Sequence, residues 1–287
     1  MQDATKAARE VTFHIWRYTP GTDRKPHSAS YRVPVHPGMT VLEGLHHIKQ
    51  SLDQSLAWRY SCRMGICGSC AVLLDGMPAL ACNTQIADVA GAELTLAPLP
   101  NFPIIRDLVP DLSPMFEKHR AVMPFIRRDK EDEINDPQGE FYQSPEELEE
   151  YLQFSFCIKC GCCMAACPTL ATDLSYLGPM PLAQAYRYNN DSRDGSCEAR
   201  SDVAGSAQGA FRCHYAGECS RVCPKGVDPA KAIQHLKRQL VLSYLHLARK
   251  KQPCAKQGPP DHAERRPEIP AAPAYTVVEP EGPPARS

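Results

Sequence analysis

The stretch Cys157-Ile-Lys-Cys-Gly-Cys-Cys-Met-Ala-Ala-Cys-Pro168 decides the organisation of this 287-residue chain. Its spacing, Cys-x2-Cys-x2-Cys-x3-Cys-Pro, is typical of bacterial two-cluster iron–sulfur sites, in which the fourth cysteine of each run serves the other cluster. Such a run needs a second copy, and from Cys213 the same offsets lead to Cys219 and Cys223. The position three residues after the start of this copy holds Ala216. The second copy therefore lacks one thiol.

Because the fourth cysteine of each run serves the other cluster, the cysteines of the two runs divide into two sites. Four thiols form one site and predict a 4Fe–4S cluster: Cys157, Cys160, Cys163 and Cys223. Three thiols remain for the other site and predict a 3Fe–4S cluster: Cys167, Cys213 and Cys219. A 4Fe–4S cluster with water or another residue on its fourth iron is the alternative for the three-thiol site.

An earlier group of cysteines has the plant-type spacing of a 2Fe–2S cluster, Cys-x4-Cys-x2-Cys followed by one distant cysteine. Its members are Cys62, Cys67, Cys70 and Cys82. Gly65 and Gly68 permit a tight loop, and a hairpin turning at Asp75-Gly76 returns Cys82 to the side of Cys70. Zinc is the alternative, but its usual ligands come as two close pairs.

These groups use eleven of the fourteen cysteines, and the remaining three are Cys162, Cys197 and Cys254. We expect Cys162 to be a buried, inert thiol and the other two to be ordinary loop thiols. No secretory signal is visible at the N-terminus, and we expect no membrane span, because no apolar run approaches ~18–20 residues. These features predict a reducing compartment, where dense cysteine indicates metal more often than disulfides.

The charge balance and the absent motifs narrow the function further. Lys and Arg total 32 and Asp and Glu total 33, for a net charge of −1, which argues against nucleic-acid binding. The chain has no dinucleotide-binding glycine pattern, no P-loop and no nucleophile elbow. Three predicted clusters, in a polypeptide without a motif for organic catalysis, indicate a protein that transfers electrons.

The hydrophobic pattern predicts an α+β fold. We expect strands at 11–18, 31–35 and 93–97, a hairpin at 71–82, and a helix capped by Thr40. From about Pro137 the pattern predicts short helices broken by cysteines, with a longer helix over 231–251. The predicted units are a 2Fe–2S domain (1–105), a linker (106–136), a helical domain for the other two clusters (137–252), and a tail (253–287) holding nine of the 27 prolines.

Beyond the cysteine spacings, the chain resembles the iron–sulfur subunit of succinate dehydrogenase/fumarate reductase, in the succinate:quinone oxidoreductase family. The resemblance runs from about Val11 to Leu245 and includes all three cysteine motifs in order. The matching segments are Ser61–Cys70, Leu80–Cys82, Ile105–Val109, Cys157–Pro168, Tyr186–Asp194 and Phe211–Gly226.

The resemblance implies an N-terminal β-grasp (plant-type) ferredoxin domain followed by an all-α helical (bacterial-type) ferredoxin domain. It also implies partners: a flavoprotein subunit whose covalent FAD interconverts succinate and fumarate, and one or two membrane-anchor subunits, with or without haem b, where a quinone binds. The chain would then serve the tricarboxylic acid cycle or anaerobic respiration without acting on the dicarboxylate itself. Its place would be peripheral, on the cytoplasmic face of a bacterial membrane. A soluble ferredoxin-like carrier for another dehydrogenase is the alternative.

The resemblance also implies quinone-binding residues, which are Pro168, His214 and Lys237. His214 as a helix cap and Lys237 as a surface charge are the alternatives. Many ubiquinone-linked members carry tryptophan shortly after the proline, whereas this chain reads Pro168-Thr-Leu-Ala-Thr172. Together with Met64, this favours the fumarate reductase branch and menaquinone over ubiquinone.

Overall fold

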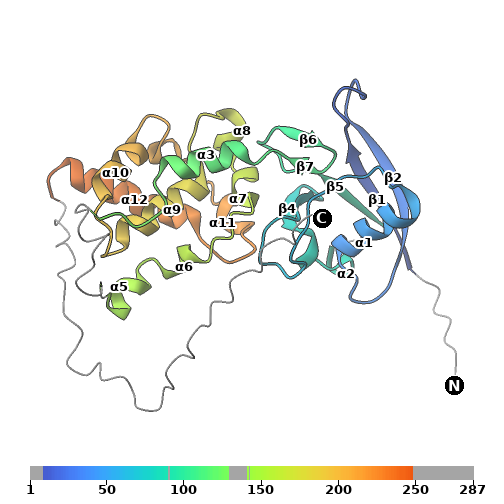
Figure 1. Ribbon diagram of the computed structural model, residues 1–287, viewed down its shortest axis with the longest axis horizontal. Coiled ribbons are helices and arrows are strands. Elements are labelled where there is room, and N and C mark those ends of the chain that lie inside the picture. Colours follow the sequence, from blue (N-terminus) through green and yellow to red (C-terminus); the bar gives the residue numbers. More distant parts are fainter. Residues whose placement is uncertain (1–8, 90, 129–140, 142, 248–287) are drawn as a thin grey trace, which may run out of the picture.

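The computed structural model describes residues 9–89, 91–128, 141 and 143–247. A sheet-containing part lies at one end of the molecule and a helical part at the other (Figure 1). The predicted proline-rich tail, Cys254 and residues 129–136 of the predicted linker lie outside the described residues.

A five-stranded sheet of order β2-β1-β5-β3-β4 forms the N-terminal part. Its strands are β1 (Arg9–Arg17), β2 (His27–Val35), β3 (Ala71–Leu74), β4 (Met77–Leu80) and β5 (Glu93–Ala97). β1 runs parallel to β5, and the other neighbours are antiparallel. The second strand begins at His27, earlier than the predicted residue 31. Its pairing with β1 runs from Val35, opposite Arg9, to His27, opposite Arg17. Pro34 lies on an edge strand, as its missing N–H requires.

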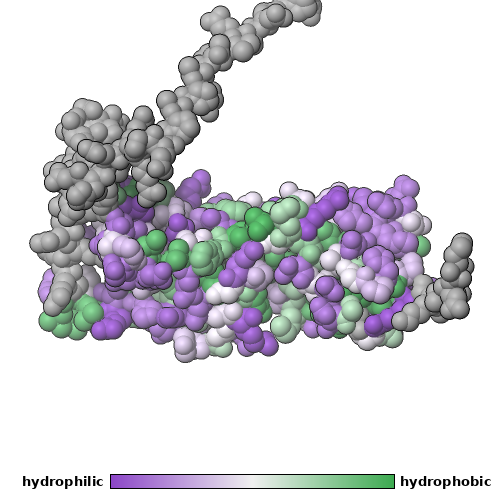
Figure 2. All heavy atoms as spheres, turned by 90° about the horizontal axis from the view of Figure 1, so that it is seen from below, coloured by the Kyte–Doolittle hydropathy of each residue, from purple (hydrophilic) through white to green (hydrophobic). Residues whose placement is uncertain are grey.

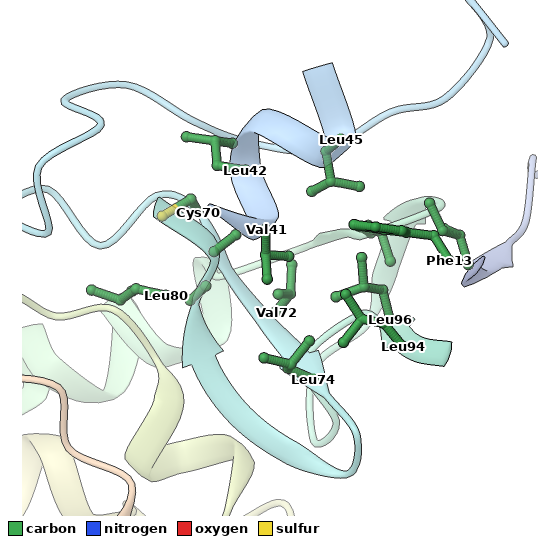
Figure 3. Close-up of a cluster of buried hydrophobic side chains, with 14 of the residues drawn as sticks. Phe13, Val41, Leu42, Leu45, Cys70, Val72, Leu74, Leu80, Leu94 and Leu96 are labelled. Carbon is green, nitrogen blue, oxygen red and sulfur yellow. The ribbon is translucent and has the colours of Figure 1, made fainter. Parts of the chain in front are cut away.

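A helix covers one face of this sheet. Thr40 and Glu43 form the predicted capping box of α1 (Val41–His47), which continues as a π-helical turn, η1 (Ile48–Leu52). Leu42 and Leu45 on the helix belong to the same buried cluster as Phe13 on β1, and Figure 3 shows these side chains together. Two short elements complete this part: η2 (Ala81–Asn83) and α2 (Ile86–Val89).

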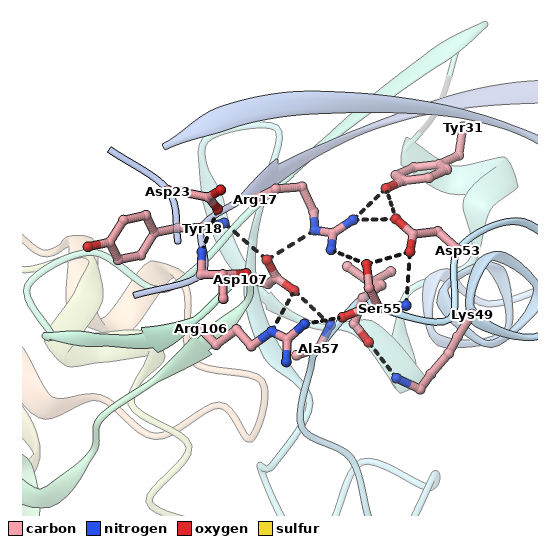
Figure 4. A network of polar contacts seen from close by, with 12 residues as sticks. Arg17, Tyr18, Asp23, Tyr31, Lys49, Asp53, Ser55, Ala57, Arg106 and Asp107 are labelled. Atoms are coloured by element: carbon pink, nitrogen blue, oxygen red, sulfur yellow. Dashed lines mark hydrogen bonds and ion pairs between the residues drawn. The ribbon is translucent and has the colours of Figure 1, made fainter. Parts of the chain in front are cut away.

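A buried polar network fixes the segment that leaves the sheet (Figure 4). Arg17 donates to Asp107 (Nε to Oδ1, 3.0 Å) and to Asp53, which also accepts from Tyr31. Burial would raise the pKa of Asp53, but hydrogen bonds from Ser55, Tyr31 and Arg17 hold it well below its usual range. Asp107 is fully buried, so this network ties β6 (Ile104–Arg106) and β7 (Val109–Pro110) to β1.

The segment predicted as a linker is folded over much of its length. Helix α3 (Ser113–Ala121) packs against α9 (Pro179–Asn190) of the helical part. Lys118 on α3 donates from Nζ to the carbonyl oxygens of Leu174 and Tyr176, at 2.6 and 2.7 Å. The described residues up to 128 are therefore part of the packed structure rather than a free connection.

The elements that follow α3 in the described residues are all helical. They are α5 (Pro145–Glu149), α6 (Leu152–Ser155), α7 (Cys162–Ala165), α8 (Pro168–Thr172), α9 (Pro179–Asn190), α10 (Cys197–Gly205), η3 (Ala210–Arg212), α11 (Glu218–Arg221) and α12 (Pro229–Tyr244). Helix α9 is buried over most of its length and contacts α12, α10 and α6.

The last helix differs from its predicted span of 231–251. It begins at Pro229, because the Asp228 side chain accepts from Lys231 N and proline suits the first helical position. It ends at Tyr244, and His246 has a left-handed backbone. The predicted C-terminal end was therefore wrong. Among the described residues, no helix combines the length and apolarity needed to cross a membrane.

Candidate metal centres

The first group of cysteines surrounds a tight loop between η1 and β3, with Cys82 added from η2. Backbone N–H groups point at the sulfurs: those of Met64 and Ile66 lie 3.4 and 3.3 Å from Cys62 Sγ, and that of Gly65 lies 3.3 Å from Cys82 Sγ. The Cys82 N–H in turn donates to Cys70 Sγ at 3.5 Å. The four predicted thiols of this site are therefore brought together, with amides placed to stabilise negative sulfur.

The thiols of this loop have unlike environments. Hydrogen bonding from the Cys62 backbone lowers the pKa of Cys67 to about 6, and Cys67 is exposed. Burial raises the pKa of Cys70 to about 12. Metal ligands are thiolates, so loading of this site must displace the proton of the buried Cys70.

The second group lines a cavity in the helical part. Its thiols are the four predicted ones: Cys157, Cys160, Cys163 and Cys223. Three come from the loop before α7 and its first turn, and one follows α11. Burial raises the pKa of Cys163 well above its usual value.

The third group lines a separate cavity. Its thiols are Cys167, Cys213 and Cys219, and they share this cavity with Pro168 and His214. Within the described residues, no three Cys, His, Asp or Glu side chains lie as close as the ligands of one metal ion. The thiols of each group instead line one shared cavity, which fits a donor set for an inorganic core larger than one ion.

The two cysteine runs repeat in the backbone as well as in the sequence. Lys159 and Tyr215 occupy equivalent positions and have φ of 55° and 61°. Gly161 and Gly217 follow with φ of 87° and 78°, and each precedes a four-residue helix, α7 or α11. Ala216 lines the third cavity at the position that corresponds to Cys160. The two loops are thus equivalent in backbone, and Ala216 has a methyl group where Cys160 has a thiol.

The three sites adjoin one another. Helix α7 connects Cys163 in the second cavity to Cys167 in the third, and α11 connects Cys219 and Cys223 in the same way. The first loop meets the second at Gly68, where a Cβ would lie 2.8 Å from Cys160 Cβ.

Asn101 holds the two parts of the chain together beside these sites. Its Nδ2 donates to the carbonyl oxygens of Met164 and Ala165, each at 3.0 Å, and it has a left-handed φ of 67°. These carbonyls end α7, so the segment after β5 caps the helix that separates the two cavities.

The contact at Gly68 gives a testable prediction. Alanine there has to adopt φ near +73° and would also press on Cys160. Gly76→Ala is the control, because Gly76 has φ of +81° but no atom within 4 Å of its Cβ position. We expect Gly76→Ala to cost about 1–2 kcal/mol of stability and leave electron transfer intact. Gly68→Ala should in addition slow reduction of the second cluster by the first, measured by rapid-freeze EPR. Equal behaviour of the two variants would contradict the contact.

The structure also places the other predicted residues. Lys237 on α12 donates from Nζ to the Cys213 carbonyl at 2.8 Å, so its charge lies beside the third cavity and not on an open face. Cys162 is fully buried and packs in the hydrophobic core of the N-terminal part, while Cys197 is exposed at the start of α10.

Sequence reasoning did not single out Tyr176 as a residue of the third cavity. Tyr176 lines it and is 1% exposed. Its segment, Asp173-Leu-Ser-Tyr176, has no spacing that distinguishes it from an ordinary loop.

Consecutive cysteine groups on a sheet-containing part and a helical part define a multi-cluster iron–sulfur protein. A family model described as a 2Fe-2S iron-sulfur cluster binding domain matches residues 12–117. A second model, described as a 4Fe-4S dicluster domain, matches residues 153–227. The predicted order of the two cluster types is confirmed.

Comparison with known proteins identifies the family. The fumarate reductase iron-sulfur subunit of Mycobacterium tuberculosis is 45% identical over 227 residues, covering 79% of this chain and 91% of the relative. That of Haemophilus influenzae is 41% identical over 243 residues, covering 82% and 94%. A chain of the Mycobacterium smegmatis Sdh1 complex in the apo form superposes with a TM-score of 0.75 at 25% identity, covering 83% of this chain and 98% of that one. The chain therefore belongs to the fumarate reductase/succinate dehydrogenase iron–sulfur subunit family and is an electron-transfer subunit of an oxidoreductase complex.

Proposed function

We propose that this chain relays electrons between the FAD of a flavoprotein subunit, where succinate and fumarate are interconverted, and a quinone at a membrane anchor. The observation that carries the proposal is the sequence of three adjoining thiol sites with four, four and three sulfurs. Bound iron–sulfur clusters supply one-electron transfer. The chain contributes the thiols that would hold them and the close succession of the three sites.

The ligands follow the three groups. Cys62, Cys67, Cys70 and Cys82 hold a 2Fe–2S cluster, and the sheet crossed by α1 is the β-grasp ferredoxin domain. The helical part is the bacterial-type ferredoxin domain. There, Cys157, Cys160, Cys163 and Cys223 hold a 4Fe–4S cluster, and Cys167, Cys213 and Cys219 hold a 3Fe–4S cluster. The equivalence of Ala216 and Cys160 supports the three-iron assignment.

The flavoprotein docks at the first loop. Met64 and Ile66, inside the cysteine loop, are 70% and 56% exposed, and Cys67 is exposed beside them. The opposite side of the same loop contacts Cys160. An electron donor therefore reaches this site from solvent, and the inner side leads to the next site.

The quinone binds at the third cavity. Pro168 and His214 line it. Lys237 donates to the Cys213 carbonyl, and in this proposal its positive charge stabilises a reduced quinone oxygen. Tyr215, which is exposed, also lines the cavity. The absence of tryptophan after Pro168 favours menaquinone over ubiquinone.

The place of the chain follows from these partners. We infer that it sits peripherally on the cytoplasmic face of a bacterial membrane, held by one or two anchor subunits, with or without haem b. Figure 2 shows apolar side chains interspersed with polar ones along one face, and no single patch marks the anchor contact there. Succinate oxidation in the tricarboxylic acid cycle and fumarate reduction in anaerobic respiration use the same path.

The test measures electron transfer to the quinone separately from succinate oxidation at the flavin. In the purified complex, Lys237→Leu should lower succinate–quinone activity by at least about tenfold while leaving dye-linked succinate oxidation unchanged. Lys231→Leu, an exposed position on the same helix, is the control. Equal loss of both activities in Lys237→Leu would contradict the quinone role. Purification of the chain without a flavoprotein or membrane partner would instead support the soluble-carrier alternative.

A further inference from the structure

Arg63 is an exposed cation inside the first cysteine loop. It directly follows Cys62, and its neighbour Met64 is 70% exposed. The Cζ atom of its guanidinium lies 5.5 Å from the centroid of the Tyr60 ring. Within the described ranges of the chain, Arg63 makes no ion pair. It therefore presents a positive charge to solvent that no carboxylate of the described residues balances.

Aromatic side chains hold the ring of Tyr60 next to this arginine. The ring of His46, on α1, meets Tyr60 edge-on, with 4.5 Å between the ring centroids. Trp58 stacks against Tyr60 at 5.8 Å and meets His46 edge-on at 5.2 Å. A guanidinium over such a ring is attracted by its π electrons. Because the arginine is already ordered by this contact, it loses less side-chain entropy when it binds an anion.

The arginine also borders a hollow between the loop and the helix. Four residues of one stripe along α1 and η1 line this hollow: Glu43, His46, His47 and Gln50. Glu43 is the one acid among the described residues that line it. Its Oε2 accepts from the Thr40 N–H at 2.7 Å in the capping box, so this carboxylate is engaged at the start of α1. The hollow therefore has room for an anion from outside the described residues, next to Arg63.

The rest of this face has the same charge character. Residues 48–70 contain a single acid, Asp53, which accepts from Arg17 and Tyr31 in the buried network. They contain three exposed cations, which are Lys49, Arg59 and Arg63. Exposed apolar or aromatic side chains lie in the same stretch: Leu52, Tyr60, Met64 and Ile66. An interface of this composition is complementary to a surface that carries carboxylates.

We propose that Arg63 binds a carboxylate side chain of the flavoprotein subunit and thereby steers that subunit onto the first cysteine loop. The planar guanidinium suits this role, because it binds a carboxylate through two parallel N–H bonds. Anionic lipid headgroups fit less well, because they attract clusters of about four to eight basic residues. The inference rests on the proposed function, since it takes the flavoprotein as the partner of the first loop.

The test is the rate at which the full-length chain, loaded with its clusters, associates with the purified flavoprotein subunit. Arg63→Glu should slow association by about tenfold at low ionic strength, and the difference should shrink as salt screens the charges. Arg32→Glu is the matched control: it makes the same charge change at an exposed position on β2, and we expect the wild-type rate. Arg63→Lys keeps the charge and should keep most of the rate.

Two further measurements keep the result unambiguous. The EPR signal of the reduced 2Fe–2S cluster shows whether each variant has an intact first loop. The wild-type rate should itself fall with ionic strength, which tests the charge without any substitution.

An unchanged rate in Arg63→Glu, a wild-type rate independent of salt, or an Arg63→Lys variant as slow as Arg63→Glu would overturn the inference. Arg63-dependent flotation with phosphatidylglycerol vesicles, combined with equal association of both chains with the flavoprotein, would overturn it in favour of a lipid surface. Failure of the wild-type chain to associate with the flavoprotein at all would instead contradict the proposed function.

Discussion

Ala216→Cys should convert the third site from a three-iron to a four-iron site. The substituted residue lines the third cavity and occupies the position of Cys160 in the repeated loop, whose left-handed residues at 215 and 217 match those at 159 and 161. The added thiol therefore needs no backbone change. The expected result is loss of the EPR signal that the oxidised protein gives, a lower potential at this site and slower quinone reduction.

Ala216→Ser is the control for this prediction. It adds a side chain of similar size without a thiolate, so the three-iron signal should persist. If Ala216→Cys also keeps the three-iron signal and full activity, ligand count does not determine the cluster type, and the assignment from the offsets is wrong.

Arg200→Met should be the most destabilising single change in the helical part. Arg200 on α10 is fully buried and pairs with Asp194, at 2.8 Å between Nη1 and Oδ2. The same guanidinium donates to the carbonyl oxygens of Val122 and Met123, each at 3.1 Å, and to Asn189 Oδ1 at 3.0 Å. Removal leaves a buried carboxylate uncompensated, which typically costs about 3–5 kcal/mol.

The measurement for this prediction is the thermal midpoint of the purified complex, with iron content determined in parallel. Arg120→Met is the control, since Arg120 is exposed on α3 and its loss should change stability by less than about 0.5 kcal/mol. Comparable effects of the two substitutions would show that the Arg200 network does not support the domain.

The part of the site that could be predicted from the sequence rests on the spacing between nearby cysteines. Ligands a few residues apart share one loop whatever the rest of the chain does, so the groups around Cys62, Cys157 and Cys213 could be identified from offsets alone. The crossing of Cys167 and Cys223 between the two cavities follows from the same rule, and the structure places each in the predicted cavity. Their roles as ligands remain predictions.

Contacts between distant segments could not be predicted in this way. Gly68 meets Cys160, and Arg200 reaches Val122, only because separate parts of the chain pack together. No pattern of residue types marks such pairs. The packing of α3 against the helical part has the same cause. The apolar face of α3 is too weak to predict a partner, and the contact depends on Lys118, which donates to the Leu174 carbonyl after α8.

The end of the last helix could not be predicted for a different reason. The apolar and basic residues after Tyr244 continue a plausible helical pattern, yet the helix stops there with a left-handed residue at His246. Periodicity indicates that a helix exists, but caps and packing decide where it ends.

The most direct test of the central claim, three sites with four, four and three thiols, is EPR of the anaerobically purified and then mildly oxidised protein. Of the three cluster types, only the 3Fe–4S cluster is paramagnetic when oxidised. We expect a strong signal in that state, with the signals of the other two clusters appearing on reduction. An EPR-silent oxidised protein that contains its full iron and sulfide would contradict the account, because it would indicate an intact four-iron cluster beside Ala216.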